Sequence, residues 1–171
     1  MTTQREQHIT NVLSKRQHDI TVIFENVQDT HNISACLRSC DAIGIAEVYI
    51  LSTKGKKESR LGKKSSASAA KWITILHYTD MNECFEAVRK KYARIFSTRL
   101  TENSIDLYKM DFTQSIALVF GNEHDGVSNE AADLSDGNFI IPQVGMIPSL
   151  NISVACAVTL YEAFRQRRRT I

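Results

Sequence analysis

Residues 139–162 read FIIPQVGMIPSLNISVACAVTLYE and contain both prolines of the chain. Pro142 lacks a backbone N–H, so the apolar run before it is expected to be a strand that ends at this residue. We expect Gly145 to adopt a backbone conformation closed to other residues, and Ser149 or Asn151 to cap the start of a helix. The stretch therefore predicts a strand, a tight loop that displays backbone groups, and a helix.

The helix that follows this loop is apolar around most of its circumference. Apolar residues recur at helical spacing on one face: Leu150, Val154, Ala157, Val158 and Tyr161. Ile152, Cys156 and Leu160 occupy other faces, so we expect burial nearly all round until Arg165. Several small residues would also let another backbone approach closely. The helix is therefore predicted to lie in the core, or to cross another segment within or between subunits.

Length and composition favour one domain over residues 1–171, because 43% of the residues are apolar and two domains would each be small. There is no signal-like segment and no long apolar run, so we expect a cytoplasmic protein without a membrane span. The four cysteines lack paired metal-ligand spacing. They predict reduced, buried thiols and no metal.

The net charge is only +2, but the cations are clustered. One cluster lies in a polar segment after residue 52 and comprises Lys54, Lys56, Lys57, Arg60, Lys63 and Lys64. A second closes the chain, at residues 165–171, and includes Arg165, Arg167 and Arg168. Such clusters indicate either a polyanionic partner such as nucleic acid or a solvated surface.

Strand-like and helix-like segments alternate along the chain. A short amphipathic helix is predicted at about residues 4–17, and strands at 21–25, 46–51, 72–77, 94–97, 115–120 and 139–141. This alternation predicts an α/β fold with a mostly parallel sheet and helices on both faces. Ligands of such sheets bind outside the carboxyl ends of the strands, which here are followed by loops after Phe24, Ser97, Phe120 and Ile141.

Polar residues gather in three of the loops. The first cluster covers residues 25–32 and is followed by Arg38; the others cover residues 121–126 and 149–151. The common dinucleotide, phosphate-loop, hydrolase and zinc-protease signatures are missing. Taken one at a time, these residues have ordinary structural explanations: an ion pair for Arg38, a turn for Glu123 and a helix cap for Asn151.

Taken in order, the three clusters resemble a known set of motifs. They read ENxxxxHNxSAxxRxxxAxG from residue 25, FGNExxGxS from residue 120, and IPxxGxxxSLNxSVAxAxxLYE from residue 141. This order is similar to the three motifs of the SpoU branch of the SPOUT RNA methyltransferases. Arg16-Gln17 and residues 161–163 also resemble the subgroup that methylates the 2′-hydroxyl of guanosine 18 in the tRNA D-loop.

The resemblance implies that the C-terminal segment of the α/β fold forms a deep trefoil knot, that the protein is a homodimer, and that S-adenosyl-L-methionine is the cofactor. A knot could not have been inferred from periodicity, since knots are exceptions to ordinary topology. Carried over by motif, the cofactor-binding residues would be Thr98, Gly121, Asn122, Ile141, Ser149 and Leu150.

The resemblance also assigns the catalytic residues, which would be Arg38, Asn32, Glu123 and Asn151. A guanidinium is effectively always protonated. We therefore expect Arg38 to hold a neighbouring phosphate and to stabilise the developing alkoxide, with Asn32 orienting it and with Glu123 and Asn151 in support. His31 and His124 are alternative proton acceptors.

The clustered cations would then bind tRNA phosphates. The predicted RNA-binding residues are Arg5, Lys15, Arg16, Lys54, Lys56, Lys57, Arg60, Lys63, Lys64, Arg165, Arg167 and Arg168. Deletion of residues 165–171 would accordingly weaken tRNA binding. Two alternatives stay open at this point: a SpoU enzyme for another tRNA or ribosomal RNA position, and an RNA-binding protein without catalysis.

Overall fold

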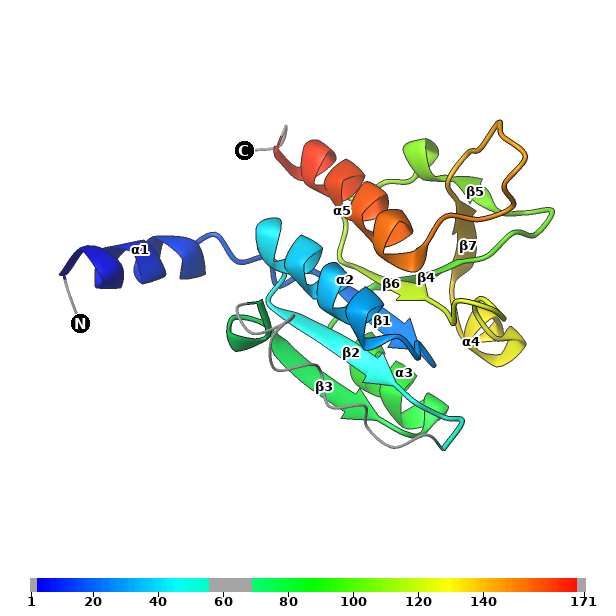
Figure 1. The fold of residues 1–171 in the computed structure, drawn as a ribbon, viewed down its shortest axis with the longest axis horizontal. Helices are drawn as coiled ribbons and strands as arrows, with labels where there is room; N and C mark the ends of the chain where they lie inside the picture. The colour runs from blue at the N-terminus through cyan, green and yellow to red at the C-terminus, as the bar shows by residue number, and fades with distance from the viewer. Residues whose placement is uncertain (1–2, 56–68, 169–171) are drawn as a thin grey trace.

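A parallel sheet of seven strands lies at the centre of the described residues, 3–55 and 69–168 of this computed structural model (Figure 1). The order across the sheet is β3 (Thr74–Tyr78), β2 (Glu47–Leu51), β1 (Ile20–Glu25), β6 (Ile116–Phe120), β4 (Arg94–Thr98), β7 (Gly137–Ile140) and β5 (Ile105–Asp106). All pairs are parallel. The predicted α/β class and the parallel sheet are confirmed.

Helices cover both faces of the sheet, as predicted. The helices α2 (Thr30–Ala42) and α5 (Ile152–Arg168) pack on one face, with the short 3-10 turns η1 (Ala69–Lys71) and η2 (Leu107–Lys109). The helices α3 (Met81–Arg89) and α4 (Asn129–Asp133) pack on the other. The two faces form separate hydrophobic clusters on either side of the sheet.

Strand β1 shows why the core has two sides. All six of its residues are buried. Since side chains alternate along a strand, Val22 and Phe24 contact the cluster of α2 and α5, whereas Ile23 contacts the cluster of α3 and α4. A continuous run of buried residues is the expected pattern for a central parallel strand.

Helix α1 (Thr3–Leu13) extends away from the sheet (Figure 1) and has no buried residue. It ends before residue 17, where the sequence placed its end. Gln17 instead forms a β-bridge with Ile45, and the Arg16 guanidinium donates to the Ile45 carbonyl over 2.9 Å. These contacts draw the chain after α1 into an extended path toward the sheet.

Two local expectations were wrong. Gly145 is not among the glycines with positive φ in the described residues, and a Cβ there would meet no atom within 4 Å. The sequence also predicted no element between residues 98 and 115, but β5 and η2 lie there and β5 pairs with β7. Its two residues are too few to show a period of two.

Helix α5 is not buried all round, contrary to expectation. Val154 and Tyr161 are 48% and 52% exposed, although Cys156 and Leu160 on the opposite side are fully buried. Of the residues at that spacing, Val154 and Tyr161 are exposed, whereas Val158 packs against the core. No helix among the described residues is both long and apolar enough to span a membrane.

Candidate active site

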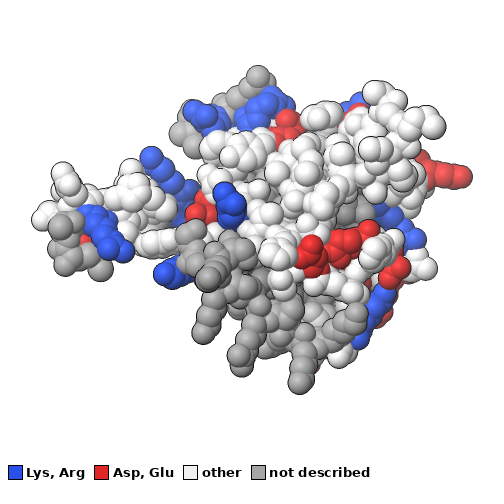
Figure 2. All heavy atoms as spheres, in the orientation of Figure 1, with Lys and Arg blue, Asp and Glu red and all other residues white. Residues whose placement is uncertain are grey.

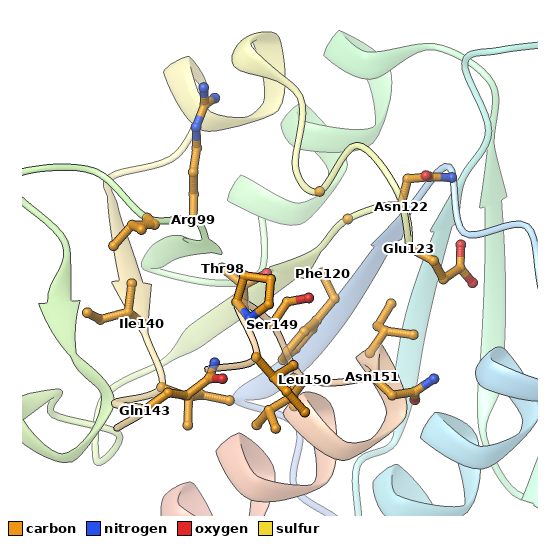
Figure 3. Close-up of a pocket in the computed structure, with 18 of the residues that line it drawn as sticks. Thr98, Arg99, Phe120, Asn122, Glu123, Ile140, Gln143, Ser149, Leu150 and Asn151 are labelled. Carbon is orange, nitrogen blue, oxygen red and sulfur yellow. The ribbon is translucent and has the colours of Figure 1, made fainter. Parts of the chain in front are cut away.

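A pocket of about 790 Å³ opens at the carboxyl ends of three neighbouring strands, β6, β4 and β7 (Figure 3). Its lining includes all six predicted cofactor-binding residues: Thr98, Gly121, Asn122, Ile141, Ser149 and Leu150. Glu123 and Asn151 line it as well. The structure thus brings the second and third sequence clusters together at one edge of the sheet, as the strand-end argument predicted.

A chain of hydrogen bonds joins all three sequence clusters beside this pocket. Asn32 Nδ2, in the first turn of α2, donates to Glu123 Oε1 over 3.1 Å. Asn151 Nδ2 donates to Asn32 Oδ1, also over 3.1 Å. Because a carboxylate only accepts hydrogen bonds, Glu123 fixes the orientation of the Asn32 amide and turns its oxygen toward Asn151.

Glu123 also accepts hydrogen bonds from the backbone N–H groups of Gln28 and Asp29, both at 3.3 Å, just before α2 begins. Partial burial acts to raise the pKa of Glu123, but the hydrogen bonds from Asn32 and from these backbone amides outweigh it and hold that pKa below its ordinary value. The positive end of the α2 dipole favours the same charge. Glu123 is therefore an ionised anchor for the start of α2.

Asn151 caps α5, as the sequence predicted. Its Oδ1 accepts from the Ser153 backbone N–H over 2.8 Å and from the Ser153 hydroxyl over 2.6 Å. The cap leaves the Asn151 amide nitrogen facing Asn32. One side chain thereby ends the pocket loop and closes the hydrogen-bonded chain.

Arg38 is separate from this chain. It is exposed on α2 and is not among the residues that line the pocket. Seven residues complete about two helical turns, so Arg38 lies on the same face of α2 as His31, which is also exposed. No hydrogen bond or ion pair joins Arg38 to another residue of the described ranges. The guanidinium is thus available to an external anion.

The loop between β7 and α5 displays backbone groups to the pocket. Within the described chain, residues 142–150 make no backbone-to-backbone hydrogen bond. The Thr98 hydroxyl, by contrast, donates to the Val119 carbonyl over 3.0 Å and is used inside the sheet. Recognition of a ligand in this pocket would therefore rely on main-chain groups of the loop.

Sequence reasoning missed Arg99, the cation that lines the pocket. Its guanidinium donates to the Ser128 carbonyl over 3.3 Å and to the Asn129 side chain, so it is tied to the start of α4. Figure 3 shows it directed away from Ser149 and Leu150. Its position directly after a strand end was the available signal.

The guanidinium groups of two predicted RNA-binding arginines form ion pairs within the fold. The Arg16 side chain is 4% exposed and pairs with Asp41 over 2.7 Å. The Arg167 side chain is 11% exposed, pairs with Asp19 over 2.5 Å and donates to the Gln114 carbonyl. Deletion of residues 165–171 would remove structural contacts, so it is not a clean test of RNA binding.

The other predicted cations differ in their surroundings. Arg5, Lys15 and Arg168 are exposed; Figure 2 shows basic side chains over α1 and beside the end of α5. Lys54 pairs with Asp125 over 2.8 Å and Arg165 with Glu162 over 2.6 Å, each with an exposed ammonium or guanidinium. Five predicted residues lie outside the described ranges: Lys56, Lys57, Arg60, Lys63 and Lys64.

Three of the four cysteines meet in the core. Cys36 and Cys40 of α2 and Cys156 of α5 are fully buried, and the neighbouring thiols together with burial raise the pKa of Cys156. In the part of the chain that the structure describes, no group of three His, Cys, Asp or Glu side chains could hold a metal ion. These thiols contribute to packing between α2 and α5.

Comparison with known proteins identifies the family. The profile of the SpoU rRNA Methylase family matches residues 19–161. The chain is 40% identical over 166 residues to the tRNA (guanosine(18)-2'-O)-methyltransferase of Thermus thermophilus, covering 97% of this chain and 84% of that one.

Solved structures agree with the sequence match. The TrmH/SpoU tRNA modifying enzyme of Aquifex aeolicus superimposes with a TM-score of 0.87 at 36% identity, over 98% of this chain and 84% of that one. The SpoU methyltransferase AviRb of Streptomyces viridochromogenes, in complex with the cofactor AdoMet, gives a TM-score of 0.80 at 27% identity, over 93% and 64%. The chain therefore belongs to the SpoU rRNA methylase family.

Proposed function

We propose that this protein transfers a methyl group from S-adenosyl-L-methionine to the 2′-hydroxyl of guanosine 18 in the tRNA D-loop. The observation that carries the proposal is the hydrogen-bonded chain of Glu123, Asn32 and Asn151 at the edge of the pocket. It joins one residue from each of the three motifs, although these residues are far apart in the sequence. The name of the Thermus thermophilus relative supports the choice of nucleotide.

The pocket fits the cofactor in size and in chemistry. Its volume lies within the range of about 300–1,000 Å³ that small-molecule sites occupy. Phe120, Ile141 and Leu150 supply apolar walls, and the unpaired backbone groups of residues 142–150 supply hydrogen-bond donors and acceptors for a polar ring edge. Bound there, S-adenosyl-L-methionine supplies a methyl group on a positively charged sulfur. The carboxylate of Glu123 suits such a cation.

The residues of this chain have to align the ribose hydroxyl and stabilise the oxygen as its proton leaves. Asn151 is held by Asn32 and by Ser153, so its amide nitrogen has a fixed direction at the pocket edge. Glu123 keeps that arrangement in place because its ionised form orients Asn32. We assign these three residues to positioning at the reacting centre.

Arg38 has a different role in this proposal. Its exposed guanidinium binds the phosphate beside the target nucleotide with two parallel hydrogen bonds and draws the ribose to the pocket edge. Arg38→Lys keeps the charge but loses the planar fork, so its single-turnover rate should fall at least tenfold while cofactor affinity is kept. A rate near that of the wild type would exclude the bidentate role.

For the remaining tRNA backbone we propose the exposed cations Arg5, Lys15, Lys54, Arg165 and Arg168, with the predicted basic residues within 56–64. Arg16 and Arg167 are left out because their guanidinium groups are paired inside the fold. Substitution of Arg5 and Lys15 by alanine should lower tRNA affinity and flatten its dependence on salt. An unchanged salt dependence would remove α1 from the binding surface.

Family membership also supports a homodimer and a knotted C-terminal segment. The exposed face of α5, with Val154 and Tyr161, offers apolar area for a second copy of the chain. Residues 141–151, which connect β7 to α5, are the segment that the knot would involve. Both features are proposals that rest on the family, as does the single-domain organisation of the chain.

The test is to incubate unmodified tRNA transcripts with cofactor carrying a labelled methyl group and then to map the modified nucleotide. Methylation of guanosine 18 on its ribose is the expected result. Methylation in the anticodon loop, or of ribosomal RNA alone, would replace this specificity with that of another SpoU enzyme. Binding of tRNA without binding of the cofactor would instead identify an RNA-binding protein.

A further inference from the structure

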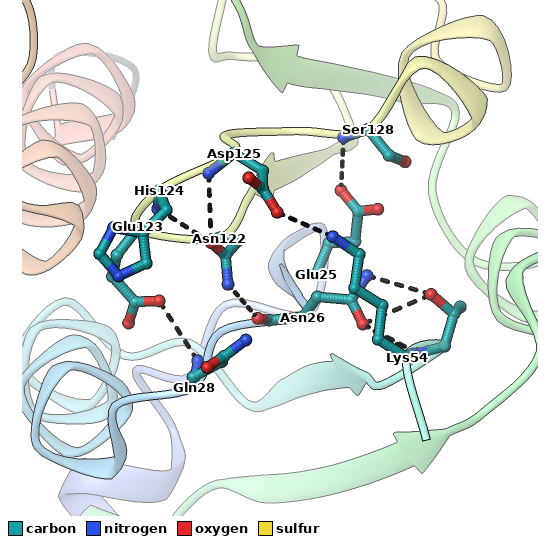
Figure 4. Close-up of polar contacts among 10 residues, drawn as sticks. Glu25, Asn26, Gln28, Lys54, Asn122, Glu123, His124, Asp125 and Ser128 are labelled. Atoms are coloured by element: carbon teal, nitrogen blue, oxygen red, sulfur yellow. Dashed lines mark hydrogen bonds and ion pairs between the residues drawn. The ribbon is translucent and has the colours of Figure 1, made fainter. Parts of the chain in front are cut away.

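The turn that carries Glu123 is held at both ends by Glu25, the last residue of β1, and by Asn26, which follows it (Figure 4). Asn122 Nδ2 donates to the Asn26 carbonyl over 2.8 Å. At the other end, the Ser128 backbone N–H donates to Glu25 Oε2 over 3.0 Å. Glu123 lies between these two anchors, so the carboxyl end of β1 determines where the turn sits.

The turn itself is closed by its own contacts. Asn122 Oδ1 accepts from the backbone N–H groups of His124 and Asp125, at 2.8 and 3.2 Å. A side chain at Gly121 would meet the backbone of Gly126 at 2.2 Å, because the turn folds back onto its own start. A turn this tightly closed moves as a unit, so the two anchors set its orientation.

The first anchor is fixed from the side of β2. Asn26 has a φ of 52°, in the left-handed region that few side chains occupy without compensation. Its side-chain oxygen accepts from the backbone N–H groups of Thr53 and Lys54, at 2.9 and 3.3 Å. These bonds hold the strained residue in place, and the direction of its carbonyl toward Asn122 follows from them.

The second anchor is a buried carboxylate. Glu25 is 1% exposed, and its Oε1 has no hydrogen-bond partner in the described part of the chain. Removing a carboxylate from water is costly, and the Ser128 hydrogen bond together with the charge of nearby Lys54 offsets only part of that cost. The core around β1 would be more stable with an apolar residue here, so packing does not account for Glu25.

We propose that Glu25 and Asn26 are positioning residues, which act through Ser128 and Asn122 to hold Glu123 against the start of α2. The inference rests on the proposed function for its catalytic meaning. Glu123 contacts Asn32 and the amides before α2 only while the turn keeps this orientation. Loss of an anchor therefore separates Glu123 from Asn32 and shifts the part of the pocket lining that residues 121–126 supply.

Two substitutions of Glu25 test the inference. Glu25→Met fills the same space but removes the acceptor for the Ser128 N–H, whereas Glu25→Gln keeps an acceptor oxygen. The readout is the pKa of Glu123, measured by carbon NMR titration of labelled glutamate carboxyls and assigned with Glu123→Gln. The ionisable neighbours Asp29, His31, His124 and Asp125 are unchanged in both variants. Glu25→Met should raise the Glu123 pKa toward its ordinary value. Glu25→Gln should leave the Glu123 pKa at its lowered, wild-type value.

The single-turnover rate of methyl transfer should follow the same order. It should fall by about 10- to 100-fold in Glu25→Met, as expected for a misplaced active-site group. Where Glu25→Met fails to fold, Ser128→Pro removes the donor instead. Ser128→Ala is its control, because it loses the same hydroxyl cap but keeps the N–H.

The outcomes separate the two proposals. A Glu123 pKa that stays at the wild-type value in folded Glu25→Met or Ser128→Pro overturns the positioning inference. A shifted pKa supports it, whether or not tRNA is methylated. Absence of methyl transfer by the wild type overturns the proposed function alone.

Discussion

Replacement of Asn32 by alanine removes the middle of the hydrogen-bonded chain beside the pocket. Glu123 would keep its backbone donors, among them Gln28 and Asp29 at 3.3 Å, and the Asn151 amide would lose its acceptor. The change in stability therefore reports on the two hydrogen bonds.

The magnitude follows from the charge and exposure of each bond. A hydrogen bond to a charged group contributes about 1.5–3 kcal/mol, and one between neutral groups about 0.5–1.5 kcal/mol. Both bonds are partly or fully exposed, which places each near the lower limit. Because alanine has the higher helix propensity, replacing asparagine by alanine in a helix adds about 0.5 kcal/mol to the free energy of unfolding. We expect Asn32→Ala to lower the free energy of unfolding by about 1.5 kcal/mol.

Urea unfolding at pH 7 measures this difference, with Asn82→Ala as the matched control. Asn82 lies in the first turn of α3 and is exposed, so its replacement brings the same helical gain without the loss of these bonds. The two variants should differ by about 2 kcal/mol. A difference below about 0.5 kcal/mol would refute the hydrogen-bonded chain as a stabilising unit. The difference should also shrink below pH 4.5, the ordinary pKa of glutamate, because the lowered Glu123 pKa makes its stabilisation greatest when ionised.

Three further predictions concern other parts of the molecule. In the proposed homodimer, Tyr161→Glu on the exposed face of α5 should give the sedimentation coefficient of a monomer. Glu86→Gln, an exposed change on α3, should leave the dimer intact. If both variants sediment as dimers, the exposed face of α5 is not the dimer interface. Glu47→Gln should lower the free energy of unfolding by about 1 kcal/mol at pH 7. Hydrogen bonds from Lys91 and two tyrosines outweigh burial and lower the Glu47 pKa, so this loss should fade below pH 4.5; a loss that persists in acid would contradict it. Burial raises the pKa of the Cys84 thiol to about 12, and all four cysteines are buried, so a thiol reagent at pH 8 should label the native protein only after unfolding.

Much of the fold was predictable because it depends on local sequence. The apolar run at 115–120 predicted a buried strand, and the structure has one at Ile116–Phe120. Pro142 marks the end of β7 because it lacks a donor, and Asn151 caps α5 because its side chain reaches the next amides. These features need no knowledge of distant residues.

The errors occurred where a distant partner decides the outcome. Arg16 and Arg167 resemble surface cations in the sequence, since their partners Asp41 and Asp19 are remote in the chain. The apolar face of α5 has the same spacing whether it meets the core or another molecule. Glu25 was visible beside Asn26 in the first motif, but only the structure shows which turn it holds.

The pairing at the centre of the sheet also constrains how the protein is made. In the β1–β6 register Ile20 lies opposite Ile116, so the central pair cannot close until most of the chain has left the ribosome. Until then one edge of β1, an entirely apolar strand apart from its threonine and its final glutamate, has no neighbour. This open edge is where newly made chains would associate wrongly, and a slow release of the β4–β6 segment would lengthen the time for which chaperones must cover it.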